Sequence, residues 1–292
     1  MTLHHDTRPL SIDLLGPDDL VETFAFLDHD PIVNVYLAAL VLRDALGHAR
    51  DQFLAARRDD AIVALLYLGP GSGAILPVGD DRDALRRLAD EAAARLASFP
   101  RRFQIIGTRP AVRPFLARFA EAGRVPRLER DQTYMALERG DLAEVEPLPE
   151  LRPAGPEDQE RMFESGVRLR TEELEEDPRR ADALAYARRV EEECRDGHTF
   201  VWADEDGLRF RASVSARTAD AAQISGVYTL PLLRNRGIAT RGVAELCRRL
   251  FGRSAAACLF VNDLNAPAIA VYRKLGFTAR AEWYSAFYTG ER

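Results

Sequence analysis

Apolar positions recur along the chain with two different spacings. Apolar residues three or four positions apart predict helices, whereas short apolar or alternating runs predict strands. In the first half these patterns predict helices at residues 17–27, 34–46, 83–96 and 112–122. They predict strands at residues 52–56, 61–68, 74–77, 103–108 and 133–137.

The second half repeats this order of elements. A strand at residues 151–152 precedes helices at 157–170 and 180–195 and a hairpin at 199–204 and 208–216. A strand at 224–230, a helix at 237–251, a strand at 256–262 and a helix at 266–275 follow, and strands close the pattern between residues 279 and 288. No residue-level repeat is visible, but the shared order predicts two copies of one fold.

The easiest place for a boundary between the copies is a segment rich in proline and acidic residues. Residues 139–158 read RGDLAEVEPLPELRPAGPED, with four prolines and two glycines. Such composition is typical of linkers and strand entries. A chain of 292 residues is long for one domain and comfortable for two. We therefore predict domains at residues 1–146 and 147–292, with the boundary near Pro147.

Composition narrows the class of protein. The chain is 47% apolar with a net charge of −6, which argues against a dedicated nucleic-acid binder. It has no apolar run of about 18 residues and no secretory signal, so we expect no membrane partner and a cytoplasmic location. Its cysteines, Cys194, Cys247 and Cys258, have no metal-like spacing. We expect no metal cofactor.

Residues 223–252 contain the pattern with the most chemical content: a strand, a tight turn and an amphipathic helix. Gly237 stands where the helix begins, and the small Ala239 follows two positions later. The first N–H groups of a helix have no internal partners, and small residues let an anion approach them. Arg234 and Arg236 add positive charge there. A pyrophosphate suits this turn; the plain alternative is a surface arginine pair beside a structural glycine.

Two motifs then carry a family resemblance. Arg234-Asn235-Arg236-Gly237-Ile238-Ala239, with Pro231 three residues earlier, resembles the acyl-CoA signature Arg/Gln-x-x-Gly-x-Gly/Ala of the GNAT acetyltransferase superfamily. The second runs from Asn265 to Phe277 and resembles the helix that lines the other wall of the CoA cleft in that family. The resemblance covers residues 150–290, and Ala239 stands where glycine is common.

The resemblance implies an α/β fold in which each domain has a mixed, mostly antiparallel sheet flanked by helices. It implies an N-acyltransferase that moves acetyl from acetyl-CoA directly to a primary amine in a ternary complex. Backbone groups of Val227, Tyr228 and Thr229 would hold the acetyl carbonyl and the pantetheine arm. The other implied CoA-binding residues are Arg234, Asn235, Arg236, Gly237, Ile238, Ala239, Thr240 and Asn265.

Tyr272 lies where the family often places the acid that protonates the departing thiolate. Alternatively, Tyr272 only packs its helix onto the sheet. The general base stays open among several carboxylates: Glu172, Glu173, Glu175, Asp263 and Glu282.

The first half lacks the CoA signature. Its corresponding turn contains Asp80 and Asp81, where a pyrophosphate needs positive charge and free N–H groups. The whole chain thus resembles tandem GNAT proteins with a degenerate N-terminal half. The acceptor would be an amine-bearing small molecule or protein, and the oligomeric state stays open. Alternatives are a non-catalytic acetyl-CoA-binding regulator and a transferase for an amino-sugar or thiol-precursor metabolite. The intact CoA turn disfavours an aminoacyl transferase that uses charged transfer RNA.

Overall fold

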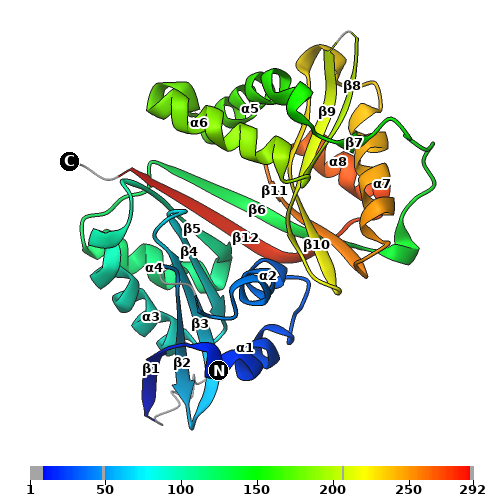
Figure 1. Cartoon of the computed structure of the whole chain (residues 1–292). Coiled ribbons are helices and arrows are strands. Elements are labelled where there is room, and N and C mark those ends of the chain that lie inside the picture. Colours follow the sequence, from blue (N-terminus) through cyan, green and yellow to red (C-terminus); the bar gives the residue numbers. More distant parts are fainter. Residues whose placement is uncertain (1–8, 48–49, 206, 290–292) are drawn as a thin grey trace. The chain divides into compact units, whose positions relative to one another are not determined.

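A computed structural model describes residues 9–47, 50–205 and 207–289 (Figure 1). The chain divides into two compact units. Unit 1 runs to Thr133 and takes in the segment from Ala281 onward, and unit 2 is Tyr134–Arg280. Among the described helices, none is long and apolar enough to cross a lipid bilayer.

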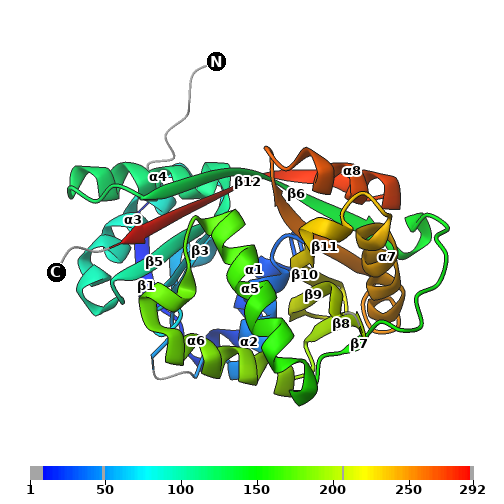
Figure 2. The same ribbon diagram turned by 90° about the horizontal axis from the view of Figure 1, so that it is seen from above.

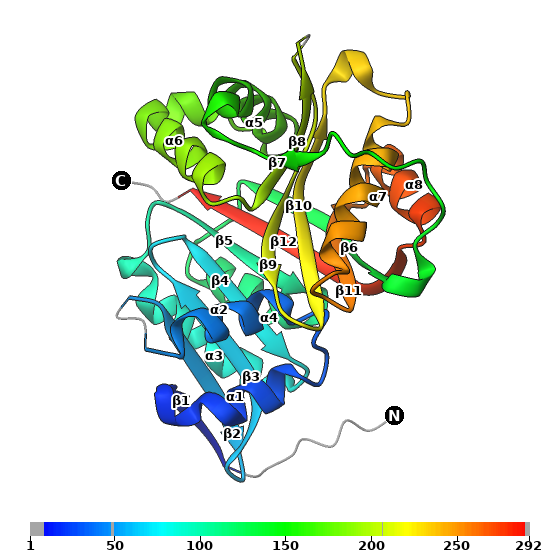
Figure 3. The same cartoon turned by 45° about the vertical axis from the view of Figure 1, so that its right-hand side comes forward.

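Unit 1 is a sheet covered by helices on both faces (Figure 3). Its strands lie in the order β1 (Leu10–Leu14), β2 (Gln52–Arg58), β3 (Ala61–Gly69), β4 (Ala74–Gly79), β5 (Arg102–Thr108) and β12 (Thr278–Thr289). All adjacent pairs are antiparallel except β4 and β5.

The two faces of unit 1 follow from the period of two along β2. Phe53 and Ala55 pack with the helices α1 (Leu20–Leu27) and α2 (Val35–Asp44). Leu54 and Ala56 point to the other face, toward α3 (Arg82–Arg95) and α4 (Arg109–Glu121). The run of consecutive apolar residues from Phe53 to Ala56 therefore reflects burial on both sides of the strand.

Unit 2 is also a sheet with helices on both faces. Its strand order is β6 (Leu128–Glu138), β11 (Ala256–Asn262), β10 (Ala221–Thr229), β9 (Gly207–Arg217), β8 (Thr199–Asp204) and β7 (Arg152–Pro153). Figure 2 shows α5 (Gln159–Leu174) and α6 (Pro178–Arg195) on one side of β8–β10, with α7 (Ile238–Leu250) on the other side. The remaining helix, α8 (Ala266–Leu275), packs in the same apolar core as α7.

Two strands pass from one unit to the other. β6 begins in unit 1 and ends in unit 2, while β12 leaves unit 2 and continues in unit 1. There β12 pairs antiparallel with β5, from Trp283 opposite Thr108 to Thr289 opposite Arg102. The strand order of unit 1 thus ends with β12, from the second half of the chain. That of unit 2 begins with β6, from the first half.

The compact units divide the chain elsewhere than the boundary predicted near Pro147. The proline-rich segment is not a free linker, because Leu148 is fully buried and α7 holds the segment. Arg241 donates to the Pro147 carbonyl at 3.1 Å, and Arg248 donates to the Val145 carbonyl. The strand that precedes it belongs to unit 2 from Tyr134 onward.

A short repeat relates the first helical turns of the two units, although the sequence analysis found none. Gly16-Pro17 and Gly155-Pro156 each open a 3₁₀ turn, η1 (Pro17–Asp19) and η4 (Pro156–Asp158). In both, the glycine N–H donates to the carboxylate of the turn's final aspartate at 2.9 Å. The element order that follows each turn is the same. This agrees with two copies of one fold.

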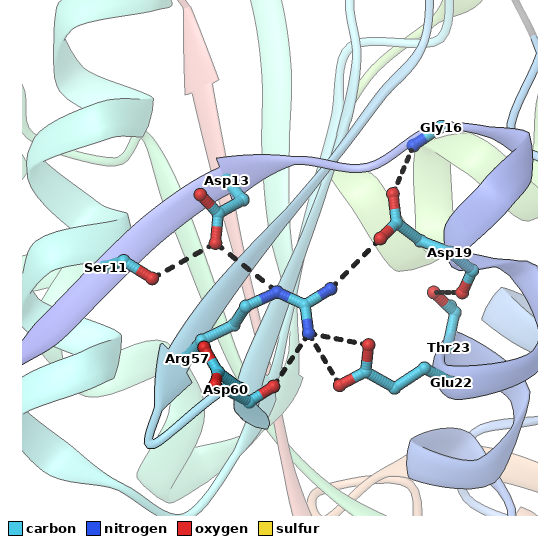
Figure 4. A network of polar contacts seen from close by, with 8 residues as sticks. All are labelled: Ser11, Asp13, Gly16, Asp19, Glu22, Thr23, Arg57 and Asp60. Carbon is cyan, nitrogen blue, oxygen red and sulfur yellow. Dashed lines mark hydrogen bonds and ion pairs between the residues drawn. The ribbon is translucent and has the colours of Figure 1, made fainter.

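The first of these turns is tied to the sheet by Arg57 on β2 (Figure 4). The guanidinium lies 3.3 Å from Asp13, 3.1 Å from Asp19 and 2.6 Å from Glu22, and it donates to the Asp60 carbonyl at 2.9 Å. Hydrogen bonds to Glu22 raise the pKa of Arg57 despite the opposing effect of burial. One largely buried cation therefore joins β1, η1 and α1 to β2.

The expected mixed, mostly antiparallel α/β architecture is confirmed. The sequence analysis missed β1, an edge strand of only five residues with no fully buried position, although its apolar Leu10, Ile12 and Leu14 alternate with polar residues. The closing strands expected between residues 279 and 288 are one strand, β12.

Candidate functional site

The candidate site begins where β10 and β11 part. These parallel strands pair over only three positions, Ala221 with Ala256 through Gln223 with Cys258. Both strands then continue, to Thr229 and to Asn262, without pairing to each other. An opening of this kind within a sheet leaves backbone groups available to a ligand.

A bulge lies on the open part of β10. The pairing of β10 with β9 jumps between Ser225 and Tyr228, so Gly226 and Val227 are paired with neither neighbouring strand. Gly226 has φ = 59°, a left-handed conformation that glycine adopts at little cost. The backbone of Val227, expected to face the acetyl carbonyl, therefore lies at an irregular and unpaired point of the strand.

The turn after β10 ends at an uncapped helix start. It passes through η5 (Pro231–Leu233) and two left-handed residues, Asn235 at φ = 63° and Gly237 at φ = 74°. No side chain caps α7, and its first helical hydrogen bond is from Arg241 N–H to the Gly237 carbonyl at 3.0 Å. The N–H groups of Ile238, Ala239 and Thr240 thus stand at a helix N-terminus with no capping group, as the pyrophosphate prediction requires.

The two arginines of the turn differ in their surroundings. Arg234 pairs with Glu172 of α5 at 2.7 Å and lies over the Tyr228 ring, 5.4 Å from its centroid. Arg236 is exposed and makes no hydrogen bond or ion pair with the described residues. Only Arg236 therefore carries positive charge that no neighbouring carboxylate balances.

Glu172 also holds Tyr228, whose hydroxyl donates to it at 3.1 Å. Burial raises the pKa of Tyr228, and the charge of Glu172 raises it further. Glu172 thus connects α5 to both β10 and the turn. The sequence named Glu172 only as one of several possible bases, because a contact across 56 residues leaves no local signal.

Tyr272 lies on α8 inside the apolar core of unit 2. Its side chain is 7% exposed, and its ring lies 5.7 Å from that of Phe277. Burial raises the pKa of its phenol, with a smaller contribution from Glu173. The phenol therefore stays protonated at neutral pH, as a general acid must, but the packing role also fits its burial.

The ends of α8 are as the sequence predicts. The Asn265 side chain accepts from the Ala268 N–H at 3.2 Å, and Gly276 ends the helix at φ = 101°. A side chain at Gly276 would meet the Asp141 carbonyl. Asn265 thus has a structural role as the N-cap, and its predicted contact with CoA stays a prediction.

Two of the candidate bases have described interactions with these residues. Glu172 contacts Tyr228 and Arg234, and Glu173 lies close enough to raise the pKa of Tyr272. Glu282 belongs to unit 1, where it pairs with Arg109 at 3.4 Å.

Unit 1 has a helix start of the opposite kind. Asp81 caps α3 and accepts from the Asp83 and Ala84 N–H groups at 3.0 and 2.9 Å. It also pairs with the buried Arg58 at 2.8 Å. Burial opposes the charge of Asp81, but these partners outweigh it and lower its pKa. A carboxylate of the chain itself thus fills the place that a phosphate would need.

Comparison with known proteins agrees with this geometry. Residues 167–277 match the model of the acetyltransferase (GNAT) family. No significant match was found among curated proteins.

Solved structures of this fold match along nearly the whole chain. A GCN5-related N-acetyltransferase from Sphaerobacter thermophilus is 16% identical with a TM-score of 0.62, covering 98% of each chain. A tandem GNAT protein from the clavulanic acid biosynthesis pathway is 15% identical with a TM-score of 0.53, covering 97% of this chain and 100% of its own. A GNAT-family acetyltransferase from Colwellia psychrerythraea is 9% identical with a TM-score of 0.53, covering 95% and 99%.

These matches show the fold, and the family match lies on the unit that has the open strands and the uncapped helix. The chain therefore has a tandem GNAT fold and carries, at residues 167–277, a domain of the GNAT acetyltransferase family.

Proposed function

We propose that this protein is an acyl-CoA-dependent N-acyltransferase that transfers acetyl from acetyl-CoA to a primary amine. One observation carries the proposal: β10 and β11 part just before an uncapped α7. The open strand offers backbone groups to a thioester, and the helix N-terminus offers N–H groups and positive potential to a pyrophosphate. Both lie on the same strand–turn–helix segment.

The residues present fit a pyrophosphate at this turn. Ile238, Ala239 and Thr240 would donate their backbone N–H groups, and Arg236 would add charge. A Cβ placed on Gly237 meets no atom within 4 Å, so this position faces open space rather than packed protein. Arg234 would contribute less directly, because it is held by Glu172.

On β10, the backbone of Val227 would hold the acetyl carbonyl, and Tyr228 and Thr229 would pair with the pantetheine arm. An N–H aimed at the carbonyl oxygen stabilises the oxyanion that forms during attack, commonly by about 3 kcal/mol. The register of β10 with β9 skips Gly226 and Val227, and this bulge would supply the N–H group.

The reaction proposed is a direct attack. The amine nitrogen bonds to the thioester carbonyl carbon, the carbon–sulfur bond breaks, and the sulfur takes the electron pair. Tyr272 would give its phenol proton to that sulfur. A base would remove the proton of the amine. Glu172, which contacts Tyr228, and Glu173, which acts on the pKa of Tyr272, are the candidates that we favour.

The test is calorimetric titration of the full-length protein with acetyl-CoA, for which we expect micromolar affinity. Mass-spectrometric screening of acetyl transfer over pools of primary amines would then identify the acceptor. Absence of acetyl-CoA binding would remove the proposal.

A second candidate, a non-catalytic acetyl-CoA-binding regulator, is favoured by the burial of Tyr272 in the apolar core. CoA binding at micromolar affinity without turnover of any amine would support it.

A further inference from the structure

A cavity of unit 2 lies beside the turn, and Arg168 of α5 is part of its lining. Its volume is about 450 Å³. Part of its lining is apolar and consists of Leu208, Leu230, Pro231, Leu233 and Leu232, which is 88% exposed. This volume is within the range of small-molecule sites, roughly 300–1,000 Å³.

The lining of the cavity carries more positive than negative charge. Arg168, Arg209 and Arg236 line it, against one carboxylate, Asp204. Asp204 already pairs with Arg209. Arg168 and Arg236 make no hydrogen bond or ion pair with the residues that the structure describes.

This local excess of positive charge stands out in a chain with 46 acidic and 40 basic residues. Neighbouring arginines repel one another unless an anion joins them, and the planar guanidinium matches the oxygens of a phosphate or carboxylate. The apolar wall favours an anion that carries an apolar group.

We propose that this cavity binds an anionic group, phosphate or carboxylate, on an apolar frame, through Arg168 and Arg236. This inference rests on the proposed function. The anionic group can then come from either of two molecules: the acceptor amine, through an acid group, or CoA, through its 3′-phosphate. Leu230 lies three extended residues beyond Val227, about 10 Å along the strand, so a ligand of moderate size reaches from the cavity to the acetyl group.

Arg168→Glu tests the cavity, because Arg168 is exposed on α5 and makes no hydrogen bond or ion pair with the residues that the structure describes; its charge acts only on the pKa of Tyr228, which it lowers. Arg253→Glu is the matched control: it reverses the charge of another exposed and unpaired arginine of unit 2 that does not line the cavity. The first probe is phenyl phosphate, with phenol as its uncharged counterpart. We expect phenyl phosphate to raise the melting temperature of the native protein and of Arg253→Glu, with little effect on Arg168→Glu.

Two further measurements distinguish the sources. If the anion belongs to CoA, Arg168→Glu weakens CoA binding tenfold or more but leaves binding of 3′-dephospho-CoA unchanged. If it belongs to the acceptor, CoA binding is unchanged, and kcat/KM falls tenfold or more for amines with an acid group relative to uncharged amines.

The same behaviour of Arg168→Glu and Arg253→Glu in all three measurements would overturn the proposal, and a difference confined to Arg168→Glu in any of them supports it. If the native protein binds no acetyl-CoA, the proposed function fails, and the phenyl phosphate measurement alone still decides whether the cavity binds anions.

Discussion

Asp81 and Gly237 occupy the same place in the two units, directly before the helix that follows β4 in one and β10 in the other. Asp81 brings a carboxylate to the helix N–H groups, and Gly237 brings no side chain. One residue thus decides whether a helix start is filled by the chain or left open to a ligand.

Replacement of Gly237 by leucine tests the open helix start. Gly237 has φ = 74°, which costs a leucine roughly 1–2 kcal/mol, and the side chain would stand in the path of a pyrophosphate. We expect CoA affinity to fall tenfold or more, about 1.4 kcal/mol by calorimetric titration. Gly237→Asn, which tolerates this conformation, should lose less. Unchanged affinity in a folded Gly237→Leu protein would place the phosphates elsewhere.

Replacement of Tyr272 by phenylalanine separates catalysis from packing, because the ring and its burial stay. Loss of a general acid should lower kcat by about 10²- to 10⁴-fold with little change in CoA affinity or melting temperature. If the residue only packs, all three measurements should stay near the native values. Full activity would remove Tyr272 from the proposed mechanism and leave the CoA site untouched.

At the scale of elements, the stability of α3 depends on its N-cap residue, Asp81. Asp81→Ala removes two hydrogen bonds at the start of the helix and an ion pair of Arg58, which is only 7% exposed. We expect a loss of about 2 kcal/mol or more in urea unfolding. The neighbouring Asp80 is exposed and caps nothing, so Asp80→Ala should stay within about 0.5 kcal/mol.

The same aspartate gives stability a dependence on pH. Because the folded state lowers the pKa of Asp81 below 3.8, its contribution is present above that pH and is lost as the pH falls further. Below pH 3.8 the difference between Asp81→Ala and the native protein should therefore narrow. A difference that stays constant in acid would show that the charge of Asp81 is not what stabilises the fold.

Helices and strands could be predicted from the sequence, but most contacts between residues far apart in the chain could not. The apolar face of α7, with Ile238, Val243 and Leu246, is a local pattern and was predicted directly. The bulge at Gly226 had a weak signal, a glycine inside a strand run, that was not used. The contacts of Glu172 and the capture of the segment around Leu148 by α7 join distant residues, and no local period records them.

For the whole molecule, the exchanged strands decide which fragments fold. A fragment that begins at Glu150 lacks Met135 and Leu137, which are buried in the core of unit 2, and it keeps β12 without its partner β5. We expect this fragment to lose the cooperative unfolding of the full chain, followed by circular dichroism in urea. A fragment spanning residues 134–280 should retain more of it. Equal cooperativity of the Glu150 fragment and the full chain would show that β6 is dispensable.

Because β12 is synthesised last, β5 lacks one of its partner strands during most of the synthesis of the chain. About 175 residues separate Thr108 from Trp283, its partner on β12. A ribosome adding about 5–20 residues per second needs roughly 9–35 s to make them, and during that time the edge of β5 has no strand to cover it. We expect unit 1 of a nascent chain halted at residue 280 to be cut readily by protease, and to become resistant only once β12 has emerged. Resistance before that point would mean that another segment shields β5 during synthesis.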